Sequence, residues 1–84
     1  MNKYENLRKR LLYRSSYRGK KEMDILLSSF VKYYINKFSK EDLDELEKLL
    51  DHEDEAILDF YQNNRSNKFF KESKISKLLK DFKI

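Results

Sequence analysis

The chain has 84 residues and a net charge of +4, from 19 Lys and Arg against 15 Asp and Glu, and it holds one glycine, no proline and no cysteine. The lack of cysteine excludes a disulfide-stabilised secreted fold and a cysteine zinc site, and the scarcity of turn residues argues against an all-β sandwich or barrel. Six Tyr and six Phe indicate a folded chain, and the length predicts one domain over residues 1–84.

The N-terminal segment predicts an amphipathic helix. Residues spaced as on one helix face run through it: Tyr4, Leu7, Leu11 and Ser15. We expect this helix to end near Arg18, because Gly19 adopts the left-handed conformation of a helix C-terminus without steric cost. Arg14 and Arg18 would then lie at the negative end of the helix dipole.

The next segment predicts a second helix over residues 23–38, starting near Lys21. Its apolar face is broad and includes aromatic side chains: Leu26, Leu27, Phe30, Val31, Tyr34 and Phe38. Sixteen residues without a turn signal favour a helix over a strand. Glu22 and Asp24 suit the positive end of its dipole.

Ser39 followed by Asp42 three residues later resembles a capping box and predicts the start of a third helix. A leucine stripe follows at helical spacing: Leu43, Leu46, Leu49 and Leu50. The sequence Asp51-His52-Glu53 interrupts that stripe. Asp54 is then expected to cap a short fourth helix, which ends at Asn63-Asn64 because asparagine tolerates the left-handed region.

The C-terminal segment from about Asn67 places apolar residues at mostly helical spacing: Phe70, Ile75, Leu78, Leu79 and Phe82. We expect a C-terminal helix or tail over residues 68–84. The predicted fold class is therefore all-α, a small bundle of four to five short helices.

The residue combinations that most catalytic mechanisms need are missing from this sequence. The one histidine, His52, lies in an acidic segment without oxyanion-hole glycines. Neither a phosphate-binding loop nor a dinucleotide fingerprint is present, so nothing predicts that the chain itself binds FAD. The acidic residues between 41 and 47 lack the order of a calcium loop and are interpreted as a solvated helix face. Binding is therefore favoured over catalysis.

The charges are segregated along the chain: residues 1–40 carry +8, residues 41–62 carry −9 and residues 63–84 carry +5. These blocks could neutralise one another in the fold, or they could present distinct faces to a partner. Basic residues alternate with four tyrosines, Tyr13, Tyr17, Tyr33 and Tyr34. This pattern leaves a small basic helical nucleic-acid-binding module as the alternative function, although the neighbouring acids would repel a polyanion.

The stretch from Arg10 to Asp24 is the most specific part of the sequence. It contains Arg18-Gly19-Lys20-Lys21-Glu22 after Arg10-Leu11-Leu12-Tyr13-Arg14-Ser15. This resembles the signature of the SdhE family, the FAD assembly factors of succinate dehydrogenase, in which Arg-Gly-x-x-Glu follows an Arg-x-Leu-[Tyr/Phe]-Arg-Ser type helix. The resemblance covers about residues 7–61. Two departures are Phe60, where the family usually has Trp, and the missing prolines around the fourth helix.

The resemblance implies a fold, a function and a partner. Family members are small helical proteins that bind the flavoprotein subunit of succinate dehydrogenase and, in some bacteria, that of fumarate reductase. They promote covalent attachment of FAD to that subunit, which is held to catalyse the attachment itself. The chain would then be an assembly factor rather than an enzyme, a monomer when free, with no metal and no stably bound cofactor. Neither nucleic acid nor a membrane is the implied partner.

The resemblance also implies the residues that bind the partner: Arg14, Arg18, Gly19, Lys20, Lys21, Glu22 and Asp24. Gly19 would let a partner backbone approach closely, Arg18 would pair with a partner carboxylate, and Glu22 would accept hydrogen bonds. A simpler interpretation assigns them local roles, in which Gly19 caps one helix and Glu22 begins the next.

The N-terminus carries no charged-then-apolar signal peptide. We therefore expect a bacterial cytoplasmic protein. A mitochondrial matrix protein whose transit segment had been removed is the alternative, and Met1 at the start of the chain argues against it.

Overall fold

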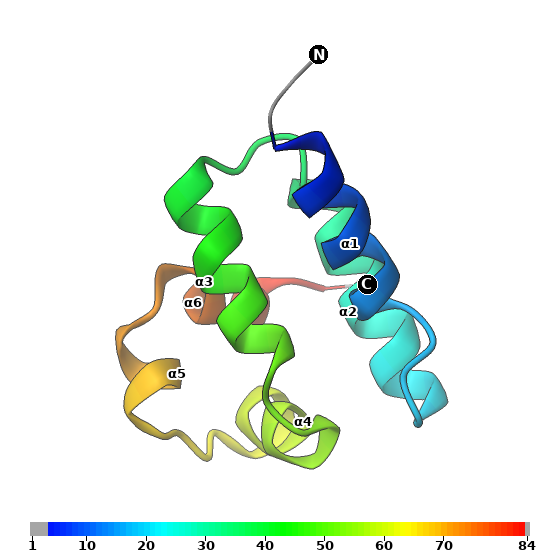
Figure 1. Ribbon diagram of the computed structural model, residues 1–84. Helices are drawn as coiled ribbons and strands as arrows, with labels where there is room; N and C mark the ends of the chain where they lie inside the picture. Colours follow the sequence, from blue (N-terminus) through cyan, green and yellow to red (C-terminus); the bar gives the residue numbers. More distant parts are fainter. Residues whose placement is uncertain (1–3, 84) are drawn as a thin grey trace.

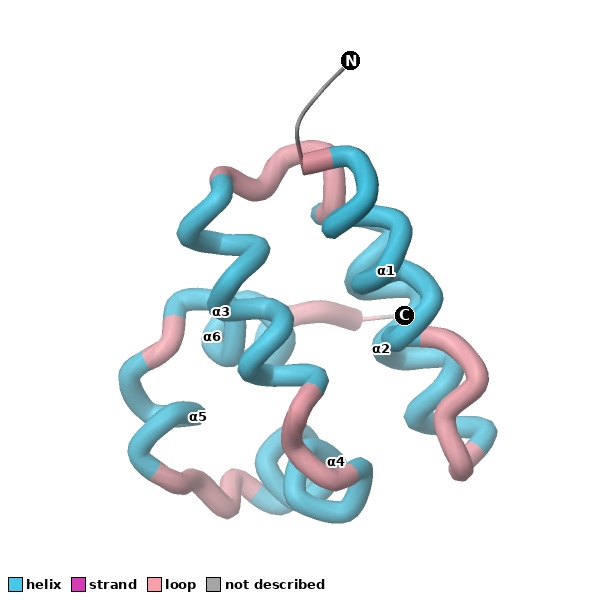
Figure 2. The backbone as a smooth tube through the Cα atoms, viewed as in Figure 1, coloured by secondary structure: helices cyan, strands magenta, loops and turns pink. Residues whose placement is uncertain are grey.

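The computed structural model describes residues 4–83, which form helices and loops and contain no strand (Figures 1 and 2). The helices are α1 (Glu5–Ser15), α2 (Lys21–Tyr34), α3 (Lys40–Leu50), α4 (Asp54–Asn63), α5 (Lys68–Glu72) and α6 (Lys74–Asp81). The all-α prediction is confirmed. The described part of the chain holds six helices instead of four or five, because Ser73 ends α5 and caps α6.

The helices form a small bundle in which α1 packs against both α2 and α3, and α6 packs against α3, α4 and α5. In Figure 1, α1 and α3 run in the same direction, and α2 returns antiparallel to α1. The loop between α1 and α2 and the loop between α3 and α4 therefore lie toward the same end of the bundle.

The core is filled by the apolar stripes that the sequence predicts. All four leucines of the α3 stripe are buried, as are Leu11 on α1 and Phe30 on α2. Phe60 is also buried, and its ring stacks on that of Phe70 at a centroid distance of 4.6 Å. An aromatic anchor is thus kept at the position where Phe replaces Trp.

Three predicted helix boundaries are wrong. Helix α1 ends at Ser15 instead of Arg18. The Ser15 and Ser16 hydroxyls both donate to the Leu12 carbonyl, at 2.7 and 3.3 Å, and such side-chain bonds compete with the helical backbone bonds. Helix α2 ends at Tyr34 instead of Phe38. A turn there buries both Ile35 and Phe38.

The third wrong boundary is the cap of α4. Glu53 occupies the N-cap position without a side-chain hydrogen bond, and Asp54 is the first helical residue. The Asp54 carboxylate is instead bonded to Arg18. At the other end of α4, Asn64 has the left-handed conformation (φ 59°), which confirms the predicted stop.

The predicted capping box at the start of α3 is confirmed. Ser39 Oγ accepts from the Asp42 amide, and Asp42 Oδ2 accepts from the Ser39 amide, both at 3.2 Å. Next to it, Lys40 Nζ lies 2.6 Å from an Asp44 oxygen, and this hydrogen bond raises the pKa of Lys40.

Replacing Ser39 by alanine is expected to lower the free energy of unfolding by about 1 kcal/mol, because the Asp42 amide loses the hydroxyl that accepts its hydrogen bond. For a domain of this size that corresponds to a fall of about 4–8 °C in Tm. Thermal unfolding followed by circular dichroism measures it. Ser66→Ala, in the exposed loop between α4 and α5, is the matched control and should leave Tm within 1 or 2 °C. Equal effects of the two variants would contradict the assignment.

Candidate functional site

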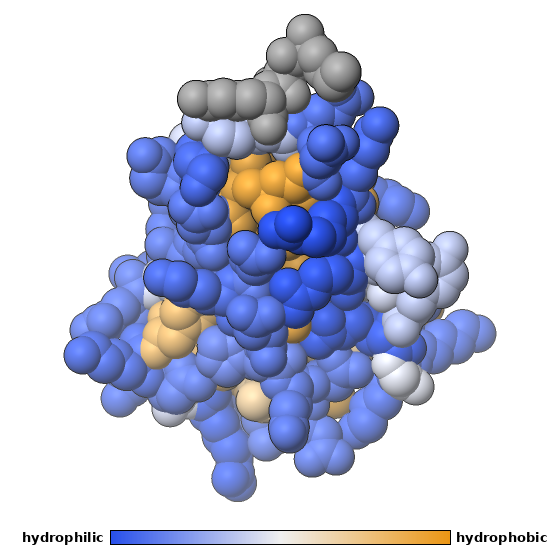
Figure 3. Space-filling model, viewed as in Figure 1, coloured by the Kyte–Doolittle hydropathy of each residue, from blue (hydrophilic) through white to orange (hydrophobic). Residues whose placement is uncertain are grey.

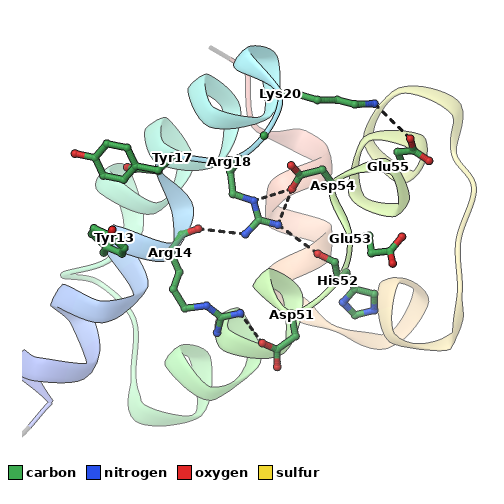
Figure 4. Close-up of a pocket in the computed structure, with 12 residues that line it drawn as sticks. Tyr13, Arg14, Tyr17, Arg18, Lys20, Asp51, His52, Glu53, Asp54 and Glu55 are labelled. Carbon is green, nitrogen blue, oxygen red and sulfur yellow. Dashed lines mark hydrogen bonds and ion pairs between the residues drawn. The ribbon is translucent and has the colours of Figure 1, made fainter.

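The two loops at the same end of the bundle enclose an open groove of about 900 Å³ (Figure 4). One wall comes from the end of α1 and the loop that follows it: Tyr13, Arg14, Ser16, Tyr17, Arg18, Gly19 and Lys20. The other wall comes from the α3–α4 loop and the start of α4: Asp51, His52, Glu53, Asp54 and Glu55. Arg18, Gly19 and Lys20 of the Arg-Gly-x-x-Glu motif therefore line the groove, whereas Lys21 and Glu22 are not part of its lining.

Arg18 joins the two walls. Its Nε and Nη2 atoms each lie 2.7 Å from Oδ1 of Asp54, and the guanidinium also donates to three backbone carbonyls. Those carbonyls belong to Arg14 (3.1 Å), Leu50 (3.4 Å) and His52 (3.3 Å). Its side chain is only 13% exposed. Arg18 thus holds the shape of the corner from inside, and the predicted pairing with a partner carboxylate stays a prediction.

Further ion pairs run along the same interface. Arg10 pairs with Glu47 at 2.9 Å, Arg14 with Asp51 at 2.6 Å, and Lys20 with Glu55 at 3.7 Å. Together with Arg18–Asp54, these contacts form an ion-pair ladder between the basic N-terminal segment and the acidic middle segment. Of the two interpretations of the segregated charges, mutual neutralisation within the fold is the one observed here.

Gly19 does not have the predicted left-handed conformation. The left-handed residue of this loop is Tyr17, with φ 57°, a conformation that costs an L-residue about 1–2 kcal/mol. Gly19 has no positive φ, and a Cβ built on it would meet nothing within 4 Å. The fold itself therefore gives no steric or conformational reason for glycine at this position.

The remaining predicted residues lie at or beside the start of α2. Lys21 and Glu22 are exposed, and neither side chain has a hydrogen bond or ion pair within residues 4–83. Lys20 contacts Glu55, as above. Asp24 accepts a hydrogen bond from the Tyr17 amide at 3.2 Å, so its carboxylate supports the left-handed residue.

Eight of the twelve residues that line the groove were not predicted as part of the site, among them Asp51, Asp54 and Tyr17. Asp51 and Asp54 were interpreted as a helix interruption and a cap, and their sequence gives no sign of contacts with residues about 36 positions earlier. Tyr17 was predicted as one of the tyrosines of the alternative nucleic-acid-binding module. It is 78% exposed. The signal that could have placed Tyr17 in the site is its position directly before Arg18-Gly19.

The groove carries no catalytic arrangement. His52 Nδ1 lies 2.9 Å from the Lys48 carbonyl, and its ring packs on Phe69 and Phe70 at 5.1 and 4.8 Å. Across residues 4–83, no three His, Asp or Glu side chains are grouped so as to hold a metal ion. In the same range, no helix is long and apolar enough to cross a membrane.

Comparison with known proteins shows the family of the chain. The family model described as "Flavinator of succinate dehydrogenase" matches residues 9–83. Several fungal proteins named succinate dehydrogenase assembly factor 2, mitochondrial, are similar to the chain. The protein of Debaryomyces hansenii is 45% identical over 78 residues, covering 88% of this chain and 55% of that protein.

The corresponding protein of Scheffersomyces stipitis is 41% identical over 78 residues, covering 88% of this chain and 52% of that protein. That of Lodderomyces elongisporus is 43% identical over 76 residues, covering 86% and 46%. The chain thus spans about half the length of the curated relatives it matches. Because these relatives are fungal and named mitochondrial, the predicted bacterial cytoplasmic location is wrong.

Proposed function

The chain belongs to the family of flavinators of succinate dehydrogenase, and on that premise we propose that it binds the flavoprotein subunit of that enzyme and promotes covalent attachment of FAD to it. The flavoprotein catalyses the attachment, and the chain holds it in a competent conformation without stably binding FAD itself. Like the relatives whose names say so, it acts in mitochondria.

The observation that carries this proposal is the exposed position of Gly19 and the open space beside it. Gly19 is the second residue of the family's motif, it is exposed, and a Cβ built on it would meet nothing within 4 Å. Since the fold does not require glycine there, the requirement is assigned to a partner whose backbone approaches the loop closely.

Glu22 supports the same surface. Its carboxylate is exposed and has no partner within residues 4–83, so it is available to accept hydrogen bonds from the flavoprotein. Lys20 and Lys21 beside it contribute charge complementarity, which steers association more than it sets affinity. Arg14, Arg18 and Asp24 have partners inside the chain and hold the loop in place.

Co-expression of the cognate flavoprotein subunit with and without this chain tests the proposal. Covalent flavin is measured as fluorescence of the denatured flavoprotein band, and we expect a strong signal only when the chain is present. Equal flavin in both cases would contradict the proposed function.

Within the same assay, Glu22→Ala is expected to lower covalent flavin severalfold, because the partner loses a charged acceptor worth about 1.5–3 kcal/mol. Glu41→Ala is the matched control. Glu41 is also exposed and also the second residue of its helix, so both variants lose the same interaction with a helix dipole. Equal flavin levels for the two variants would remove Glu22 from the docking surface.

A further inference from the structure

Tyr17 has a backbone conformation that the fold alone does not favour. Its φ of 57° lies in the left-handed region, where a bulky aromatic residue is a true outlier. Two residues later, Gly19 has no positive φ. Stability alone would place the glycine at position 17 and any residue at position 19.

The Tyr17 side chain gains little burial in return for this conformation. It is 78% exposed, and its ring packs on that of Tyr13, which is 69% exposed, at a centroid distance of 5.3 Å. In Figure 4 both rings lie across Arg18 from the acidic wall of the groove. We call these two rings the tyrosine pair.

The loop is braced so that the left-handed residue persists. Asp24 Oδ1 accepts a hydrogen bond from the Tyr17 amide at 3.2 Å, and the next residue, Arg18, is fixed by Asp54 and three carbonyls. Strained residues that the surrounding structure over-determines are concentrated at ligand clamps and active sites. Exposed aromatic residues are also the side chains that contribute most to binding at protein interfaces.

From these observations we infer that the tyrosine pair anchors the partner, as an aromatic contact surface for an apolar segment of the flavoprotein. This inference rests on the proposed function and adds Tyr13 and Tyr17 to its docking surface. The tyrosine pair is continuous with the loop around Gly19, because the two rings and Gly19 line the same groove. Binding there would bury two rings that already pack on each other and one of which stands on a braced backbone, which reduces the entropy cost of association.

A protein partner fits this surface better than a nucleic acid. Stacking on bases requires nearby cations for the phosphates. The basic side chains that line the groove, Arg14, Arg18 and Lys20, each face a carboxylate of the opposite wall. The surface beside the tyrosine pair is therefore close to neutral.

The test measures stability and affinity together. Affinity is measured by titrating labelled chain with the cognate flavoprotein subunit, and stability as Tm. Tyr17→Gly is expected to weaken binding at least tenfold without lowering Tm, because glycine adopts φ 57° freely. Tyr13→Ala should weaken binding by a similar factor, because it removes the other ring of the tyrosine pair. It should not lower Tm, because position 13 lies on an exposed helix face. Tyr13→Phe and Tyr17→Phe should bind within about threefold of the unsubstituted chain.

Tyr33→Ala is the matched control. Tyr33 is also a largely exposed tyrosine, but it lies near the other end of α2, 12 residues beyond Lys21 or about 18 Å along the helix. We expect its removal to leave affinity unchanged. Equal effects of Tyr33→Ala and Tyr17→Gly would overturn the inference, and so would a loss of binding that follows a fall in Tm.

Other outcomes separate this inference from the proposed function. If the unsubstituted chain binds the flavoprotein and both tyrosine variants bind equally well, only the inference fails. If the unsubstituted chain does not bind, the proposed function fails as well. A tyrosine-dependent dimer in sedimentation velocity, or tyrosine-dependent binding of a poly(U) oligonucleotide, would identify a different occupant and overturn the assignment.

Discussion

Arg18→Ala is expected to lower the free energy of unfolding by about 2–4 kcal/mol. The substitution removes the guanidinium that donates hydrogen bonds to three backbone carbonyls. It also leaves the Asp54 carboxylate, only 19% exposed, without its partner. For a domain of 84 residues, with a total stability of about 4–12 kcal/mol, this is a large fraction. Urea denaturation followed by circular dichroism measures the change.

Asp54→Ala provides the second arm of a double-mutant cycle with Arg18→Ala. The two substitutions are expected to be strongly non-additive, because either one already breaks the same pair. Asp51→Ala is the matched control. Its pair with Arg14 is more exposed, with the Asp51 side chain 62% exposed, and such pairs contribute at most about 1 kcal/mol.

Arg18→Ala and Asp54→Ala also separate a bracing role of Arg18 from direct contact with the flavoprotein. If Arg18 acts by holding the loop, Asp54→Ala should also reduce covalent flavin in the co-expressed flavoprotein, although Asp54 lies outside the motif. Full flavin with Asp54→Ala and none with Arg18→Ala would instead favour direct contact.

Gly19→Val is expected to abolish covalent flavin in the co-expressed flavoprotein while leaving Tm within a few degrees. A Cβ at position 19 meets nothing within 4 Å, and the backbone there is not left-handed. The valine side chain would occupy the space into which we propose the partner backbone fits. Flavin fluorescence of the denatured flavoprotein and thermal unfolding of the variant give the two readings.

A graded series sharpens this test. Gly19→Ala should give an intermediate loss of covalent flavin, because it adds one carbon atom instead of three. Ser66→Val places a valine in another exposed loop and should leave covalent flavin unchanged. Normal flavinylation with Gly19→Val would remove the glycine from the proposed docking surface.

The helices and their local caps could be predicted because their determinants lie within a few residues of each other. Ser39 and Asp42 form the capping box within one turn, and Asn64 stops α4 by its own tolerance of positive φ. The division of the last segment also has a local signal. Phe70 and Ile75, both buried, are five positions apart, which breaks the helical spacing at the place where Ser73 separates α5 from α6.

The site could be predicted in position but not in its internal contacts. The motif identifies the loop around Gly19, whereas the loop's shape depends on Asp54, which is 36 positions from Arg18. A carboxylate at a helix start has two uses, as a cap or as a partner for a distant cation, and local sequence does not distinguish them. The left-handed residue was likewise assigned to glycine on intrinsic preference, whereas tertiary contacts impose it on Tyr17.

The ion-pair ladder also limits which insertions and deletions the chain can accept. Its pairs keep a nearly constant separation in sequence, from Arg10–Glu47 to Lys20–Glu55. One residue inserted into α3 after Glu47 would rotate everything that follows by about 100° and misalign Asp51 and Asp54 together. The segment between α4 and α5, which no pair of the ladder crosses, is where length variation among relatives would leave this corner intact.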